Sequence, residues 1–132
     1  MELQTLRDAE RYLDGLINRE KKTQYDYERL GLAPIRALLA AIGNPERGLR
    51  CLHVAGSKGK GTVTLVAEHL LRAAGKSVGA YTSPHLVSWR ERFRIDGAPV
   101  GEAALVRALR AMQPEIERLR QAGMLNPQPQ RV

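Results

Sequence analysis

The amino-acid sequence predicts a mixed α/β fold in which a glycine-rich loop joins a strand to a helix. A short apolar run at residues 49–55 has the composition of a buried strand. A glycine-rich turn follows at residues 56–61, and apolar residues then recur at helical spacing from Val63 to Ala74. A second apolar run at residues 77–82 completes a strand–helix–strand unit, in which the two strands are expected to be parallel.

The composition limits the classes of protein that fit this chain. With 132 residues, 43% of them hydrophobic and 27% charged, the chain has the length and composition of one globular domain. No apolar stretch approaches the ~20 residues of a membrane span, and the N-terminus lacks the pattern of a secretory signal. The single cysteine, Cys51, is predicted to be a small buried residue. These features favour a cytoplasmic protein that has no membrane partner.

The segments on either side of the strand–helix–strand unit are predicted to be mostly helical. Helical spacing of apolar residues predicts a helix over residues 3–19, followed by a loop to residue 30. Pro34 fits the first turn of a second helix, which Gly43-Asn44-Pro45 ends. Asp96-Gly97 between two extended runs predicts a β-hairpin. A last helix is expected at residues 105–119, bent or broken at Pro114.

The glycine-rich turn carries the clearest chemical signal. Gly56, Gly59 and Gly61 let the backbone approach a phosphate closely. Their N–H groups and the N-terminus of the following helix would form an anion-binding cradle. Lys60 can reach the outer phosphates of a nucleotide, and the Thr62 hydroxyl can help to bind Mg²⁺.

The spacing of this turn differs from the common Walker pattern. Gly56 lies four positions before Lys60 rather than six, and Thr62 lies two after it rather than one. An ordinary glycine-rich turn with exposed lysines is the alternative, and for Lys58 a solvated side chain is favoured over a ligand. The strand before the turn, the helix after it and the hydroxyl in the first helical turn favour phosphate binding.

The net charge of +7 raises the question of a nucleic-acid partner. The arginines are dispersed among acidic residues, and aromatic residues make up only 5% of the chain, too few for a base-stacking platform. A small anionic ligand explains a basic surface equally well. We therefore expect no nucleic-acid partner, and the three histidines lack the spacing of a metal site.

Three blocks of the sequence resemble one enzyme family, the folylpolyglutamate and dihydrofolate synthases of the Mur ligase type. The string from His53 to Thr62 is similar to that family's His-Val-Ala-Gly-Thr-Asn-Gly-Lys-Gly-Ser loop, although Ser57 and Lys58 replace Thr-Asn. The block Tyr81-Thr82-Ser83-Pro84-His85-Leu86, followed by Glu91-Arg92-Phe93-Arg94-Ile95, resembles its Thr-Ser-Pro-His-Leu … Glu-Arg-Ile segment. Gly31 to Arg36 with Gly43-Asn44-Pro45 is similar to its segment ahead of the loop. The second block is the specific one, because other Mur ligases share only the loop.

The resemblance implies the N-terminal part of a Mur-ligase-type, parallel-sheet ATP-binding domain over residues 1–122, with a turn or disordered tail at 123–132. The family uses ATP to phosphorylate the carboxylate of a folate or dihydropteroate, and the amine of glutamate then attacks the acyl phosphate. Its other magnesium ligands and its glutamate-binding domain would lie downstream, so the chain alone would be inactive. The full-length family member is expected to be a monomer.

The resemblance also assigns roles to single residues. Lys60, His85 and Arg92 would act in catalysis, and Ser83 would bind Mg²⁺ together with Thr62. The ATP phosphates would be bound by Gly56, Ser57, Lys58, Gly59, Lys60, Gly61 and Thr62.

Each of these residues also has a structural interpretation. Taken alone, Ser83 before Pro84 indicates a strand-ending turn, and His85 a structural histidine. Arg92 and Arg94 would then lie on a solvated strand face, with Phe93 and Ile95 turned inward. The alternatives to a ligase are a stand-alone nucleotide- or polyanion-binding module and, least favoured, a nucleic-acid binder.

Overall fold

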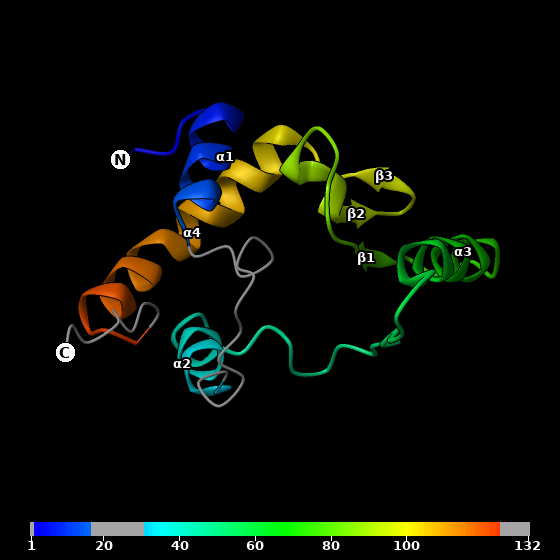
Figure 1. The fold of residues 1–132 in the computed structure, drawn as a ribbon, viewed down its shortest axis with the longest axis horizontal. Coiled ribbons are helices and arrows are strands. Elements are labelled where there is room, and N and C mark those ends of the chain that lie inside the picture. The colour runs from blue at the N-terminus through cyan, green and yellow to red at the C-terminus, as the bar shows by residue number, and fades with distance from the viewer. Residues whose placement is uncertain (1, 17–30, 125–132) are drawn as a thin grey trace. The chain divides into compact units, whose positions relative to one another are not determined.

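A computed structural model of the chain describes residues 2–16 and 31–124. These residues form two compact units, residues 2–10 with 50–106 and residues 11–16 and 31–49 with 107–124. None of the described helices is long and apolar enough to cross a membrane. The elements, in chain order, are α1 (Leu6–Gly15), α2 (Ala33–Ala41), α3 (Lys60–Ala73), β1 (Gly79–Tyr81), the 3-10 turn η3 (Trp89–Arg92), β2 (Phe93–Ile95), β3 (Ala98–Pro99) and α4 (Glu102–Gln121) (Figure 1).

The first unit contains a three-stranded antiparallel sheet in the order β1-β2-β3. Strands β2 and β3 form the hairpin that Asp96-Gly97 predicts. The φ angles of Asp96 and Gly97 are 48° and 88°. Positive φ at both central positions is typical of a two-residue turn that matches the twist of its strands. The hairpin prediction is therefore confirmed.

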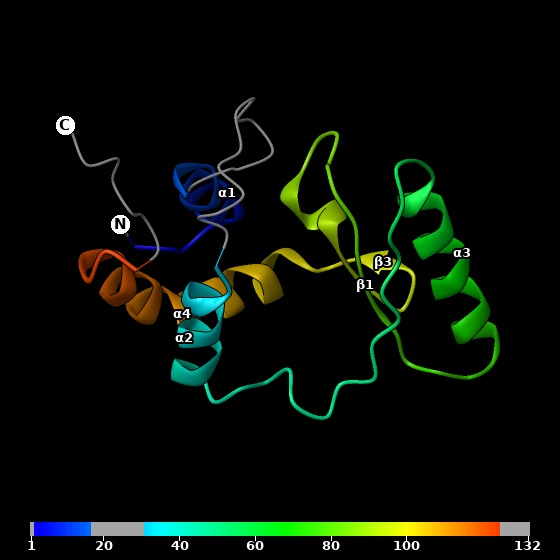
Figure 2. The ribbon, with the colours of Figure 1, turned by 60° about the horizontal axis from the view of Figure 1, so that its bottom comes forward.

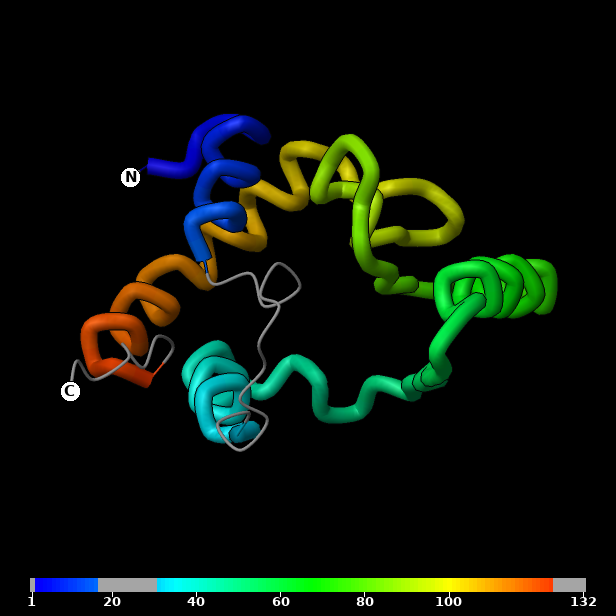
Figure 3. Tube along the Cα trace, viewed as in Figure 1, coloured from blue at the N-terminus to red at the C-terminus, as the bar shows by residue number. Residues whose placement is uncertain are grey.

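Helix α3 leads into this sheet and lies against β1. Its backbone starts after Gly59 (φ 73°) and ends before Gly75 (φ 74°), two positions that favour glycine because a side chain there would be strained. Both ends agree with the sequence prediction. The trace in Figure 3 passes from α3 through a short connection into β1.

The strand predicted at residues 49–55 is not formed. No strand is assigned to this segment, and the side chains of Leu49 and Leu52 are 67% and 69% exposed. Cys51 is exposed as well, against the expectation that it is buried. A strand exists only where neighbouring backbone pairs with its N–H and C=O groups. In the described residues β1 pairs with β2, the next strand along the chain, so the sheet is antiparallel and not parallel.

Helix α1 is shorter than the predicted range 3–19. Its start is capped reciprocally, because the Thr5 N–H donates to the Asp8 carboxylate (2.9 Å) and the Asp8 N–H donates to the Thr5 hydroxyl (3.2 Å). The helix ends at Gly15. The loop predicted up to residue 30 lies outside the described residues, as does most of the tail predicted at 123–132.

The helices of the second unit follow the predicted positions. Pro34 lies in the first turn of α2, and Gly43 and Asn44 stop that helix with positive φ angles of 87° and 52°. Helix α4 continues through Pro114, so of the bend or break predicted there the break is excluded. Proline removes one helical hydrogen bond, and here buried residues on both sides hold the helix. Buried in this unit are Tyr12, Leu109, Ile116 and Leu119.

Candidate functional site

The glycine-rich loop ends where α3 begins. Lys60 is the first residue of this helix, and its ammonium crosses the loop to donate a 2.7 Å hydrogen bond to the Gly56 carbonyl oxygen. Gly56 has a φ of 152° and Gly59 one of 73°. The loop therefore closes on itself through the lysine that the sequence predicts as the phosphate ligand.

The first turn of α3 presents backbone donors beside this lysine. The first helical hydrogen bond runs from the Val63 N–H to the Gly59 carbonyl (2.9 Å). The N–H groups of residues 60–62 therefore have no partner within the helix, as at every helix start. Such donors at the positive end of a helix favour a phosphate. Ser57, Lys58 and Thr62 are exposed around them.

Ser83 follows the end of β1. In Figure 2 the chain runs upward from β1, and α3 also begins at the upper side of this unit. The Ser83–Pro84 peptide bond is cis, and Ser83 is exposed. Among the described residues no hydrogen bond joins Ser83 to the glycine-rich loop. Its strand is part of an antiparallel sheet, and not of the parallel pair that the sequence predicts.

His85 and Arg92, the other two predicted residues, are in direct contact. The Arg92 Nε–H donates to His85 Nδ1 at 2.8 Å. The Arg92 guanidinium lies 4.4 Å from the centre of the Trp89 ring. The centre of the His85 ring lies 4.9 Å from the same Trp89 ring centre. Arg92 is only 5% exposed, whereas Ile95 is 56% exposed. The interpretation that Arg92 lies on a solvated strand face is therefore wrong, because His85 and Trp89 cover its guanidinium.

Glu91 fixes the backbone around His85. Its carboxylate accepts hydrogen bonds from the N–H groups of Leu86 (2.9 Å), Val87 (2.9 Å) and Ser88 (2.7 Å). These bonds to the charged form lower the pKa of Glu91 below its usual value. This role was not predicted from the sequence, although Ser88-x-x-Glu91 has the spacing of a capping box.

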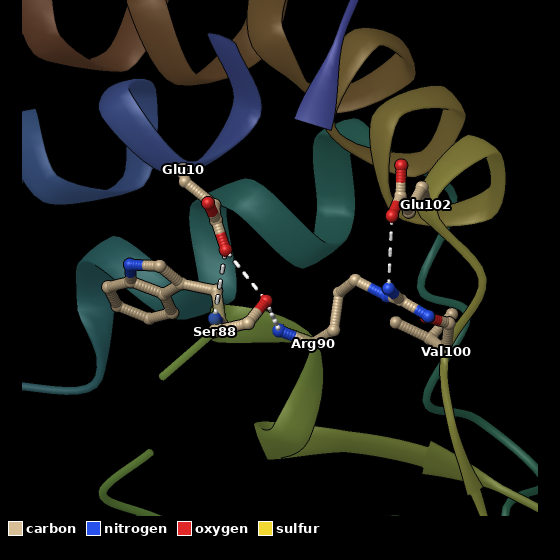
Figure 4. A network of polar contacts seen from close by, with 6 residues as sticks. Glu10, Ser88, Arg90, Val100 and Glu102 are labelled. Atoms are coloured by element: carbon tan, nitrogen blue, oxygen red, sulfur yellow. Dashed lines mark hydrogen bonds and ion pairs between the residues drawn. The ribbon is translucent and has the colours of Figure 1, made fainter. Parts of the chain in front are cut away.

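A second carboxylate holds the same segment from α1. Glu10 accepts hydrogen bonds from the Ser88 hydroxyl (2.7 Å) and the Trp89 N–H (3.2 Å) (Figure 4). On the other side of η3, Arg90 donates to the Val100 carbonyl (2.7 Å) and contacts Glu102 (3.2 Å). No local signal points to Glu10, because it lies 78 positions from Ser88 in the chain.

Comparisons with known proteins agree with the resemblance seen in the sequence. No protein-family model matches the chain. The folylpolyglutamate synthase of Lacticaseibacillus casei is 44% identical over 87 residues, which are 66% of this chain and 20% of that protein. The dihydrofolate synthase/folylpolyglutamate synthase of Bacillus subtilis is 35% identical over 91 residues, 69% of this chain and 21% of that protein. The chain belongs to the folylpolyglutamate synthase/dihydrofolate synthase family.

A solved structure extends the agreement to the fold. A complex of folylpolyglutamate synthase with AMPPCP and folate aligns with a TM-score of 0.74 and 33% identity, over 93% of this chain and 28% of that one. The predicted α/β fold of Mur ligase type is thus confirmed, as an N-terminal part of such a protein. The chain spans about a fifth of the length of the two curated relatives.

Proposed function

We propose that this chain is the ATP-phosphate-binding part of a ligase that joins a folate- or dihydropteroate-type carboxylate to glutamate. The observation that carries the proposal is the loop at the start of α3, where Lys60 lies beside the backbone donors of the first helical turn. The relative solved with AMPPCP and folate supports both the nucleotide and the carboxylate substrate. Family membership favours this function over a stand-alone nucleotide- or polyanion-binding module.

Lys60 and the first turn of α3 have defined roles in this proposal. Lys60 would bind the β- and γ-phosphates, and the N–H groups of residues 60–62 would bind their oxygens. A substrate carboxylate oxygen attacks the γ-phosphorus with loss of ADP. The glutamate amine then attacks the resulting acyl phosphate at its carbonyl carbon, and inorganic phosphate leaves. The positive charge of Lys60 would stabilise the charge that develops on the transferred phosphoryl group.

The hydroxyl groups of Thr62 and Ser83 fit Mg²⁺ that is bound together with the nucleotide. Both are hard oxygen ligands, the kind that Mg²⁺ prefers, and both are exposed. Neither is charged, and the described residues contain no group of three or more His, Cys, Asp or Glu side chains that could hold a metal ion. Next to these two hydroxyl groups, the phosphates of ATP would supply negative charge that balances this ion.

Part of the proposed reaction would require residues outside this chain. We propose that residues 1–122 form the N-terminal part of the ATP-binding domain of a monomeric, cytoplasmic enzyme. The charged magnesium ligands and the glutamate site would come from the remaining length that its relatives possess. The chain by itself is then expected to bind ATP without forming the amide bond.

Calorimetric titration with ATP and Mg²⁺ tests the proposal. Lys60→Ala should abolish binding and leave the far-ultraviolet circular dichroism unchanged, because Lys60 is exposed. Lys58→Ala is the matched control, since it removes the same charge two positions away in the same loop. It should retain most of the affinity. Equal ATP affinity in the wild type and the Lys60→Ala variant would remove the proposed phosphate site.

A further inference from the structure

The contact between Arg92 and His85 restricts where the histidine carries its proton. A guanidinium has N–H donors only, and it stays protonated in proteins. Arg92 Nε lies 2.8 Å from His85 Nδ1, so Nδ1 must accept this hydrogen bond. In a neutral imidazole one ring nitrogen accepts and the other donates. The proton of His85 therefore resides on Nε2.

The ring is also held in one orientation. His85 packs on Trp89 at a ring-centre distance of 4.9 Å and an interplanar angle of 43°. The guanidinium of Arg92 lies 4.4 Å from the centre of the same ring. Glu10 in turn holds the backbone N–H of Trp89, and Glu91 holds the backbone that follows His85. A half-turn of the imidazole would put a carbon where Nδ1 now accepts, and would leave the buried Nε–H of Arg92 without this partner.

We propose that Arg92 is a positioning residue that keeps His85 in the Nε2–H tautomer, so that His85 donates a hydrogen bond to an anionic oxygen of the substrate. The donor role rests on the proposed function; the tautomer does not. His85 lies two residues after Ser83, in the segment that leaves β1 toward the end of the unit where α3 begins (Figure 2). A neutral donor held in advance of binding favours a phosphoryl or carboxylate oxygen and requires no reorganisation of the ring. Arg92 then acts through His85 and not on the substrate.

Nitrogen-15 NMR of the histidine rings tests the tautomer directly. The full chain has three histidines, so labelling histidine alone gives six ring signals, and His85→Gln assigns those of His85. We expect a protonated Nε2 and an unprotonated Nδ1 in the wild type. Arg92→Met, which keeps the buried stem without the donor, should produce a mixture of both tautomers. A proton on Nδ1 in the wild type, or an unchanged tautomer in Arg92→Met, would overturn the proposal.

Controls separate this role from a merely structural one. Arg94→Met removes a neighbouring guanidinium that contacts Glu68, and it should leave the His85 signals unchanged. A mixture of His85 tautomers in Arg94→Met would contradict a specific effect of Arg92. The fluorescence of Trp89, the single tryptophan, reports whether the packing around it survives each change. If Arg92→Met does not fold, the wild-type spectrum still decides the tautomer.

The donor role has its own test, apart from the phosphate site. Titration of the wild-type chain with ATP and Mg²⁺ should shift the Nε2 and Nε2–H resonances of His85, and leave those of His69, an exposed residue of α3, nearly unchanged. Intact ATP binding without a shift at His85 would overturn the donor role alone. Absent ATP binding would overturn the proposed function, and the tautomer measured without nucleotide would stand.

Discussion

The carboxylate of Glu68 in α3 accepts a 2.8 Å hydrogen bond from the backbone N–H of Gly97, at the tip of the β2–β3 hairpin. The same carboxylate accepts from the Arg94 Nε–H at 2.9 Å, and Glu68 is 4% exposed. Helix α3 is thus tied to the sheet by a buried polar contact. Its large apolar residues remain exposed, Leu70 at 62% among them. The element that begins with Lys60 is therefore positioned by Glu68.

Replacing Glu68 should destabilise this unit. Glu68→Ala leaves the Nε–H of Arg94 and the N–H of Gly97 without the Glu68 acceptor, which costs about 2–3 kcal/mol of unfolding free energy. Urea unfolding followed by Trp89 fluorescence measures the loss. Glu115→Ala is the matched control, because its partner Arg118 is 61% exposed. That change should cost below about 1 kcal/mol, and equal losses in the two variants would contradict a special role for Glu68.

Gly97 is expected to be intolerant of a side chain. Its φ is 88°, and an added Cβ would collide with the guanidinium of Arg72. The arginine can move aside, so the strained backbone dominates, at about 1–2 kcal/mol for Gly97→Ala. Gly15→Ala, at a helical position with open space around it, should be neutral or stabilising by up to about 1 kcal/mol. Thermal unfolding of the two variants checks the contrast, and a neutral Gly97→Ala would refute the strain.

Glu91 should make the stability of the chain depend on pH in the acid range. Hydrogen bonds from the N–H groups of Leu86, Ser88 and Val87 hold its pKa below the usual 4.5. Because the folded pKa is the lower one, the stabilisation is present above pH 4.5 and is lost as the pH falls through the folded pKa. Glu91→Gln should therefore be less stable than the wild type at neutral pH, and the difference should shrink in acid.

Urea unfolding of both proteins at neutral pH and at about pH 3 measures this difference. Comparing the two proteins at each pH removes the contribution of Asp96. The pKa of that residue is also lowered, by the Val78 N–H and the Ser77 hydroxyl, so its contribution to stability is also lost in acid. A stability difference that is constant over this range would contradict the role of the Glu91 charge.

Tyr12 should lose its proton at unusually high pH. Burial, then the hydrogen bond to Glu117 (2.9 Å) and the charge of that carboxylate, raise its pKa from 10.0 to about 12. Since the folded pKa is the higher one, the contribution to stability is complete below pH 10 and is lost as the pH rises toward 12. Absorbance at alkaline pH should show a tyrosine that titrates near 12 and is missing in Tyr12→Phe. Titration of all tyrosines near their ordinary pKa would disprove this.

Much of the fold was predictable because its signals are local. Single glycines signal a positive φ at positions 59, 75 and 97. Each of them marks an element end or a turn in the structure. The capping box of Ser88 and Glu91 is equally local, and its spacing was available in the sequence. Family membership also followed from contiguous blocks of residues, and the comparisons confirm it.

Local residue patterns were therefore enough to predict the glycine-rich loop, both ends of α3, the hairpin and the family. Contacts in the folded chain were needed to show that residues 49–55 form no strand, that Arg92 is buried against His85, and that Glu10 and Glu68 hold the site. The physical reason is distance along the chain. Pairing of strands and burial of charge depend on groups that are far apart in the chain, such as Glu10 and Trp89 at 79 positions, and no short window of residues contains both partners.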